Sequence, residues 1–377
     1  MDFNLTEEQQ MLRKTARDFM EKECPKSLVR EMENDENGYS PELWHKMVKL
    51  GWLGLIFPEE YGGGGGNYID LIVLLEEFGR ALVPGPFLST VVYCGLPVLD
   101  KGTEKQKQDI LPKIAKGQMI MSLALSELSA SHQASGIAVK AIQEKDDYII
   151  NGTKLFVPDA HVADWLLCAT RTKETEREEE GITLFLVNAK SPGINCTPSK
   201  DIASDTQCEV VFNSVRVPKD NILGRPDHGW EIVKKVTEQA AIAQCALMVG
   251  GSQYVLEMTV SYAKDRVQFG RPIGSFQIIQ HKCADMATDL DSTRFITYEA
   301  AWKLSESLPA TMEVAMAKAC ASEAYGRICA HGHQIQAGVG LMKDHDMQLY
   351  FRRAKTAEAA FGDPDFHREI VAQQLLL

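Results

Sequence analysis

The stretch Arg266-Val267-Gln268-Phe269-Gly270-Arg271-Pro272-Ile273 separates two long segments in which apolar residues recur at helical spacing. Two further segments of the same kind follow. Four long helices joined by short loops are typical of a helix bundle. The sequence therefore predicts a C-terminal four-helix bundle over residues 227–377. Its helices are predicted at 229–267, 276–305, 309–337 and 345–360.

The chain up to residue 118 also predicts helices. Thr6 and Gln9 have the three-residue spacing of a capping box, which marks a helix start. Ser40 followed by Pro41 predicts a second start, because serine caps helices and proline suits the first helical position. Residues 1–118 are therefore predicted to form an N-terminal helical domain. Its later helices are predicted at 69–82 and 105–116.

Between these helical parts, residues 119–226 carry short strand-like runs separated by turn residues. Asp146-Asp147 and Asn151-Gly152 are predicted turns. The region predicts a middle antiparallel β domain and gives the chain an α+β fold class. The strands are predicted at 119–125, 136–142, 148–150, 165–170, 183–187 and 209–217.

Charge and cysteine content narrow the class of protein. The chain has 40 basic and 52 acidic residues, a formal net charge of −12 that argues against nucleic acid as a partner. Its nine cysteines are odd in number and irregularly spaced, so they predict thiols and not a disulfide framework. The sequence has neither a membrane-spanning apolar run nor a signal-peptide pattern, so no integral membrane segment and a cytoplasmic location are expected.

General motifs leave the function open. The sequence has no glycine-rich dinucleotide or P-loop pattern, no HExxH and no GxSxG. His331, His333 and Asp344-His345-Asp346 are metal-ligand types, but neighbouring positions on a helix face different ways, so no metal site is predicted. These patterns indicate an α+β enzyme or a binding protein.

Several longer strings stand in a fixed order along the chain. They are Leu5–Gln10, Phe57–Gly63, Gly102–Lys107, Ala124–Glu127, Asn151–Lys154, Arg266–Ile273, Gln334–Gly340 and Tyr350–Lys355. In this order and spacing they resemble the acyl-CoA dehydrogenase family, and the resemblance covers nearly all of the chain. The family fold is an N-terminal helical domain, a middle β domain and a C-terminal four-helix bundle, the order predicted above.

The resemblance implies a flavoprotein enzyme with FAD as cofactor and an acyl-CoA thioester as substrate. A carboxylate removes the α proton while a hydride leaves the β carbon, and hydrogen bonds to the thioester carbonyl make the α proton acidic. Electrons are expected to pass to electron-transferring flavoprotein. The family also implies a tetramer, either a homotetramer or a heterotetramer with a related subunit.

The resemblance assigns one group of residues to the cofactor. Ser126 matches a family threonine that hydrogen-bonds the flavin ring. Arg266 and Gln268 match the segment that reaches the FAD pyrophosphate of a neighbouring subunit, and an arginine fork suits phosphate geometry. Gln334 and Gly338 match the loop at the adenosine part of that FAD. The full expected set is Leu125, Ser126, Phe156, Arg266, Gln268, Phe269, Gln334 and Gly338.

The family's catalytic base is missing from both of its usual positions. Gly362 stands where most members have a glutamate, and Ala240 stands where some members place it instead. Asp363 is one residue from the first position and is the candidate base. Asp363-Pro364 also fits a helix-capping turn, so both interpretations remain open.

Other departures concern the flavin and the substrate. Pro158 replaces a threonine expected near the flavin, and proline offers neither a hydroxyl nor an amide hydrogen. His132 replaces a serine that contacts acyl-CoA; it and Glu238 are the candidate substrate-binding residues, although His132 also fits an exposed loop position. The missing base loop suggests a bulky or cyclic acyl group. Three functions remain open: a dehydrogenase, a non-catalytic partner subunit that completes its partner's FAD site, and an oxidase of the same fold.

Overall fold

The structure is a computed structural model that describes residues 4–376. The chain divides into two compact units. Of the described residues, the helical unit contains 4–30, 67–83 and 241–376. The sheet unit contains residues 31–66 and 84–240. Within the described residues, no helix is both long and apolar enough to cross a membrane.

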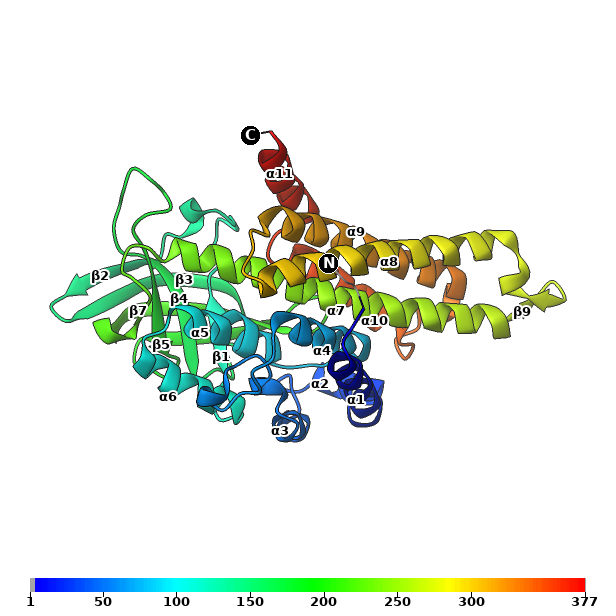
Figure 1. The fold of residues 1–377 in the computed structure, drawn as a ribbon, viewed down its shortest axis with the longest axis horizontal. Helices are drawn as coiled ribbons and strands as arrows, with labels where there is room; N and C mark the ends of the chain where they lie inside the picture. Colours follow the sequence, from blue (N-terminus) through cyan, green and yellow to red (C-terminus); the bar gives the residue numbers. More distant parts are fainter. Residues whose placement is uncertain (1–3, 377) are drawn as a thin grey trace. The chain divides into compact units, whose positions relative to one another are not determined.

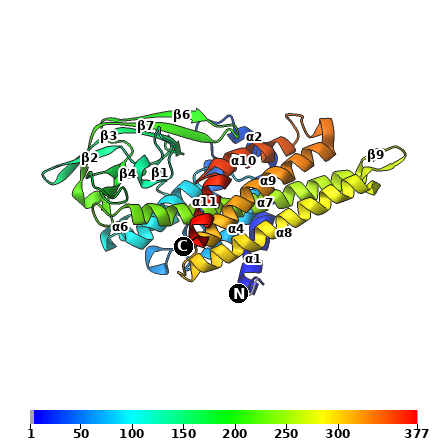
Figure 2. The same ribbon diagram turned by 90° about the horizontal axis from the view of Figure 1, so that it is seen from above.

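The helical unit is built on long antiparallel helices. Helices α8 and α9 lie side by side in Figures 1 and 2, and Arg327 on α9 forms an ion pair of 2.9 Å with Asp289 on α8. Next to the loop that joins the two helices, Lys303 and Glu313 form an ion pair of 2.5 Å. The helices are α1 (Glu7–Glu23), α2 (Lys26–Met32), α4 (Tyr68–Ala81), α7 (Trp230–Asp265), α8 (Gln277–Ser305), α9 (Thr311–Gln336), α10 (Met347–Ala359) and α11 (Pro364–Leu375).

Helix α4 packs against α7 at unusually close range. A Cβ atom at Gly250 would lie 1.7 Å from the carbonyl oxygen of Glu76, and one at Gly79 would lie 2.1 Å from that of Leu247. Only glycine allows this backbone approach. The carboxylate of Glu76 is buried there and accepts hydrogen bonds from Tyr298 and Arg294, which satisfies its charge.

The sheet unit carries an eight-stranded, predominantly antiparallel sheet with strand order β6-β7-β3-β2-β4-β5-β8. Strand β1 pairs with β4 in parallel, off this path. The strands are β1 (Met121–Ala124), β2 (Lys140–Glu144), β3 (Asp147–Pro158), β4 (Trp165–Arg171), β5 (Ile182–Asn188), β6 (Ile194–Lys200), β7 (Thr206–Pro218) and β8 (Ile222–Leu223). Its helices are α3 (Pro41–Lys49), α5 (Leu96–Lys101) and α6 (Glu104–Ala115), with a π-helical stretch at Leu88–Gly95.

The predicted helix starts are confirmed. Thr6 and Gln9 form the capping box of α1, and Ser40 caps α3 with Pro41 at its first turn. The predicted turn at Asn151-Gly152 is wrong. These residues lie inside the long strand β3, where the register against β7 shifts between Ile150 and Gly152. Gly152 therefore lies at a β-bulge. Glycine suits a bulge as well as the turn that was predicted.

Candidate functional site

A buried lysine anchors the segment that carries two of the predicted cofactor residues. The ammonium of Lys154, on β3, donates 3.0 Å to the carbonyl of Leu125 and forms a 2.6 Å ion pair with Glu127. The Lys154 side chain is fully buried and that of Glu127 is 8% exposed. A buried charge requires such partners. The backbone N–H of Leu155 adds a 2.9 Å hydrogen bond to the carbonyl of Ser126.

Glu127 extends this anchor to the next part of the chain. Its carboxylate accepts the backbone N–H groups of Ala138 and Val139 at 3.1 Å. One carboxylate thus holds the strand lysine on one side and the start of β2 on the other. We name the residues Leu125, Ser126, Glu127, Lys154 and Leu155 the lysine clamp. Sequence reasoning placed Glu127 and Lys154 in two separate family strings and missed that they form one ion pair.

Phe156 follows the lysine clamp directly on β3. Its φ of +52° is rare for a residue with a side chain, and its ring is 66% exposed. Pro158, two residues on, uses its carbonyl to accept a hydrogen bond from the hydroxyl of Ser122. The structure therefore brings the predicted residues Leu125, Ser126 and Phe156 together on one part of the sheet unit.

The predicted pyrophosphate segment forms a β-hairpin after α7. Strands β9 (Val267–Gln268) and β10 (Arg271–Pro272) pair antiparallel, and Phe269 and Gly270 turn the chain with φ of +52° and +78°. Figures 1 and 2 show this hairpin beyond the ends of α7 and α8. The side chain of Phe269 is 91% exposed.

The predicted adenosine residues lie at the same end of the helical unit. Gln334 is in the last turn of α9, and Gly338 is in the 3₁₀ turn Ala337–Val339 that follows. Lys282, near the start of α8, donates a hydrogen bond to the side chain of Gln334. Because α8 starts shortly after the hairpin, this contact places Gln334 at the end of the unit that carries Arg266 and Gln268.

Asp363 caps α11. Its Oδ1 accepts the backbone N–H of Phe366 at 2.8 Å, Pro364 occupies the first turn, and the side chain of Asp363 is exposed. The predicted capping turn is therefore present. The cap occupies one of about four acceptor positions of the carboxylate, which leaves others for a proton. The role of Asp363 as a base stays a prediction.

The residue at the missing base position is tightly constrained. Gly362 is buried with φ of +102°, and a Cβ atom there would lie 2.3 Å from the ring of Phe366 and 3.0 Å from the imidazole of His367. The carbonyl of Gly362 accepts a 2.9 Å hydrogen bond from the buried ammonium of Lys318. The backbone at this position therefore favours glycine. Sequence reasoning missed Lys318, a single lysine in an alanine-rich helix without any motif around it.

The remaining predicted residues are spread over the chain. Ala240, at the second predicted base position, is fully buried in α7, and Glu238, two residues earlier, is half-buried. His132 is exposed between β1 and the 3₁₀ turn Ala134–Gly136. The structure does not bring His132 into the lysine clamp.

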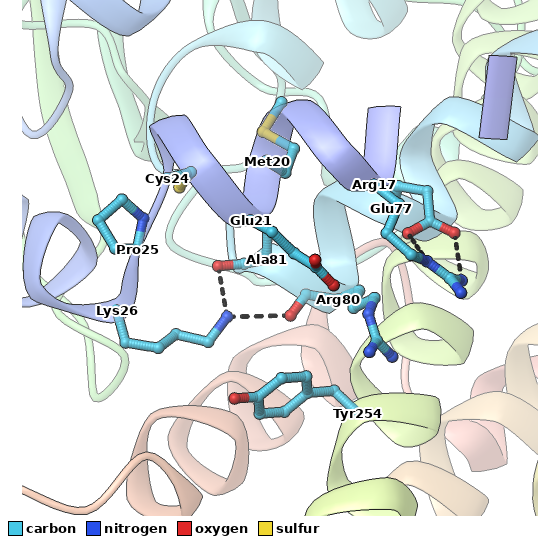
Figure 3. Close-up of a pocket in the computed structure, with 10 residues that line it drawn as sticks. All are labelled: Arg17, Met20, Glu21, Cys24, Pro25, Lys26, Glu77, Arg80, Ala81 and Tyr254. Carbon is cyan, nitrogen blue, oxygen red and sulfur yellow. Dashed lines mark hydrogen bonds and ion pairs between the residues drawn. The ribbon is translucent and has the colours of Figure 1, made fainter. Parts of the chain in front are cut away.

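A pocket of about 180 Å³ opens between α1, α2, α4 and α7 in the helical unit (Figure 3). Its charged groups hold the fold together. The ammonium of Lys26 donates to the carbonyls of Arg80 and Ala81 at the end of α4, and burial lowers its pKa to about 8. Arg17 holds Glu77 through two hydrogen bonds. None of the predicted site residues lines this pocket.

Family models match the chain in three consecutive parts. An acyl-CoA dehydrogenase N-terminal domain matches residues 6–118, a middle domain matches 122–215 and a C-terminal domain matches 227–376. The probable acyl-CoA dehydrogenase YngJ of Bacillus subtilis is 37% identical over 382 residues, covering 100% of both chains.

Two further similarities concern proteins that work in complexes. The caffeyl-CoA reductase–Etf complex subunit CarC of Acetobacterium woodii is 32% identical, over 98% of this chain and 99% of its own. A chain of the ChsE4–ChsE5 complex from Mycobacterium tuberculosis superposes with a TM-score of 0.91 at 28% identity, covering 100% of this chain and 99% of that one.

Proposed function

The chain belongs to the acyl-CoA dehydrogenase family of oxidoreductases acting on CH–CH bonds, and from this we propose that it serves the FAD-dependent α,β-dehydrogenation of an acyl-CoA thioester. The lysine clamp is the observation that best supports the proposal. It holds Leu125 and Ser126 beside Phe156, three residues that the family resemblance assigns to the flavin from two separate parts of the chain. When bound, FAD supplies the acceptor for the hydride that leaves the β carbon.

The side chains at the predicted cofactor positions have chemical groups that suit FAD. Ser126 offers a hydroxyl and Phe156 an exposed aromatic ring, which suit the polar edge and the flat face of a flavin. Arg266, exposed after α7, offers the planar fork of donors that suits a pyrophosphate. The lysine clamp holds the backbone of Leu125 and Ser126, so the main chain that carries the hydroxyl is in place before any ligand binds.

We propose that the hairpin β9–β10 binds the FAD of a neighbouring copy in a tetramer. Phe269 exposes an aromatic ring at the tip, and Val267 beside it is 53% exposed. Burying such apolar surface against another chain is favourable. Arg266, Gln268, Gln334 and Gly338, at this end of the unit, would then complete the partner's cofactor site.

On the substrate side, we propose that His132 and Glu238 contact acyl-CoA and that Asp363 removes the α proton. As the cap of α11, Asp363 is fixed in direction by its 2.8 Å hydrogen bond from Phe366. Its carboxylate keeps further lone pairs for a proton. The acyl group is proposed to be bulky or cyclic, since the glutamate loop of straight-chain enzymes is replaced.

A second function is favoured by Gly362. Its positive φ and the nearby ring of Phe366 exclude a glutamate without rearrangement, and the other base position, Ala240, is filled by a buried methyl group. These observations support a non-catalytic subunit that completes the FAD site of a related chain. The likeness to a chain from a two-protein complex supports the same alternative.

Electron-transferring flavoprotein is the proposed electron acceptor, and the cytoplasm is the proposed location. The name of the related CarC subunit couples a family member with Etf, which supports the acceptor. An oxidase of the same fold would instead transfer electrons to oxygen. Peroxide formation during acyl-CoA turnover without the flavoprotein distinguishes the two.

Flavin content and flavin bleaching decide between the first two functions. The chain is purified alone and after co-expression with a related subunit, and the flavin absorbance is followed as straight-chain or cyclic acyl-CoA is added. Bound flavin that bleaches in the lone chain supports a self-sufficient dehydrogenase. Bleaching only in the co-expressed complex, retained when Asp363→Asn is introduced, supports the partner-subunit function and contradicts the first.

A further inference from the structure

Two cysteines of the sheet unit lie next to each other on the outermost pair of strands. Cys196 is on the edge strand β6 and Cys208 is on its neighbour β7. Cys196 is opposite Val210 and Cys208 is opposite Pro198, so the two thiols are diagonal neighbours on the same face of the sheet. The two side chains are close enough for each thiol to affect the ionisation of the other.

A histidine approaches this pair from the connection between β3 and β4. The Nδ1 atom of His161 lies 3.8 Å from the Sγ atom of Cys208, and its Nε2 atom lies 3.1 Å from the carbonyl oxygen of Asn37. A carbonyl only accepts hydrogen bonds, so Nε2 carries the hydrogen in the neutral imidazole. The lone pair of Nδ1 therefore faces the thiol of Cys208.

The two thiols differ in their surroundings. The neighbouring thiol of Cys208 lowers the pKa of Cys196, which is half-buried on the edge strand. The neighbouring thiol of Cys196 and burial raise the pKa of Cys208, which is 1% exposed. Oxidation selects thiols that ionise readily and that solvent reaches. Cys196 meets both conditions, and Cys208 is placed to react second.

We propose that Cys196 and Cys208 form a dithiol that hydroperoxides oxidise to a disulfide, with His161 as the proton acceptor. Cys196 gives its proton to solvent, and its thiolate attacks a peroxide oxygen. The S–O bond forms, the O–O bond breaks, and the hydroxide that leaves takes up that proton as water. Cys208 then gives its proton to Nδ1 of His161 and attacks the Cys196 sulfur. The S–S bond forms, the S–O bond breaks, and the departing hydroxide takes the proton as water. In total, two thiols and one hydrogen peroxide give a disulfide and two waters.

The strand arrangement permits the closure that a disulfide needs. Diagonal partners in a sheet have Cα atoms about 7–8 Å apart, and a disulfide prefers about 4.4–6.8 Å, so β6 must shift toward β7. As an edge strand, β6 is paired on one side in this sheet, and its residue opposite Cys208 is Pro198, which has no N–H to lose. On its other side Cys208 pairs with Val157, next to Phe156. Oxidation at Cys208 thus reaches the strand that carries a proposed flavin residue.

Peptide mapping after treatment with hydrogen peroxide tests the dithiol. In the folded protein we expect a Cys196–Cys208 linked peptide, a mass loss of two hydrogen atoms and the loss of two alkylatable thiols, all reversed by dithiothreitol. Cys208→Ser should stop at a sulfenic acid on Cys196 that dimedone labels. His161→Asn should slow disulfide formation at least about tenfold at neutral pH, because it removes the proton acceptor.

The half-buried Cys283, on α8, gives the matched control. Cys283→Ser should leave both the linked peptide and its rate unchanged. Should Cys208→Ser fold poorly, Cys196→Ser gives the complementary test, since dimedone should then leave Cys208 unlabelled. Labelling of Cys283 as fast as Cys196, or the absence of the linked peptide, overturns the proposal. These measurements need neither flavin nor acyl-CoA, so they are independent of the function proposed above.

Discussion

The ammonium of Lys318 donates a 2.9 Å hydrogen bond to the carbonyl of Gly362, the residue that the sequence comparison predicts at the family's usual base position. It donates a second, of 3.1 Å, to the carbonyl of Glu358 near the end of α10. Lys318 is fully buried, and burial lowers its pKa to about 8. One lysine of α9 therefore fixes both the end of α10 and the loop at Gly362 that precedes α11.

Lys318→Met should destabilise the protein, because it leaves the carbonyl groups of Gly362 and Glu358 without their donor. Each unsatisfied group costs about 1–3 kcal/mol, partly offset by removing the buried charge, so we expect a net loss of about 2 kcal/mol. Chemical denaturation measures it. Lys355→Met is the control, since Lys355 is an exposed residue of α10 that pairs with Glu358 at 3.1 Å. Equal losses for the two variants would contradict the anchoring role.

Gly362→Glu should fail to restore the family's base. The φ of +102° and the 2.3 Å approach of a Cβ atom to Phe366 predict a loss of stability of about 1–3 kcal/mol and no gain in acyl-CoA-dependent bleaching. Gly362→Ala should lose a similar amount, since the strain arises at the Cβ atom. A stable Gly362→Glu protein that bleaches faster than the parent would show that the loop adapts to the glutamate.

Asp363→Asn separates the two roles of this residue. Asparagine caps helices as well as aspartate does, so the melting temperature should stay nearly constant while the carboxylate is lost. If Asp363 is the base, the rate of bleaching should fall at least about a hundredfold in the preparation that bleaches. Asp365→Asn, on the same turn and 90% exposed, should leave the rate unchanged. An unchanged rate in Asp363→Asn rejects the catalytic role and keeps the cap.

Glu127→Gln should weaken both the fold and flavin binding. It leaves the fully buried ammonium of Lys154 without a countercharge, which costs about 3–5 kcal/mol. The lysine clamp loosens, so we expect purified protein with less bound flavin as well as a lower melting temperature. Glu174→Gln breaks the exposed ion pair with Lys140 and should change stability by less than about 0.5 kcal/mol. Full flavin content in Glu127→Gln would contradict the positioning role of the clamp.

The elements that the sequence predicted well are those whose signals are local. The capping residues Thr6 and Ser40 act within one helical turn, and the helical spacing in α7 to α9 extends over many turns. Strand β6 was not predicted, since it is an edge strand exposed along most of its length and contains Pro198. Without one buried face, a strand has no alternating pattern to read.

The sequence predicted which residues belong to the candidate site, but it did not predict the contacts between them. Family strings pointed to Ser126 and Phe156, but the bonds that join them run through Lys154, whose partners lie 27 and 29 residues away. Similarly, the sequence shows that Gly362 departs from the family's glutamate. Its positive φ and its hydrogen bond to Lys318 depend on the folded backbone. Such long-range pairs leave no periodic signal in one sequence.

The buried carboxyl of Asp159 should make the stability of the protein fall as the pH rises. Burial raises the pKa of its carboxyl from 3.8 to about 6, although the hydroxyl of Ser89 donates a 2.6 Å hydrogen bond to it. Below about pH 4 the folded and unfolded chains both hold the proton. Between pH 4 and 6 the folded state keeps it and the unfolded state loses it, so stability falls as pH rises through this window. Above pH 6 the buried charge is a constant penalty.

Asp159→Asn should therefore stabilise the protein most above pH 6, by up to about 3 kcal/mol, and progressively less toward pH 4. Asparagine also tolerates the φ of +55° and can still accept the bond from Ser89. Thermal melts at pH 4.5 and pH 7.5 measure the difference. Asp146 has its pKa lowered by the hydrogen bond from Lys219, so Asp146→Asn is the control that should give no stabilisation at pH 7.5. A stabilisation by Asp159→Asn that stays equal at both pH values would show that the Asp159 proton is not the cause.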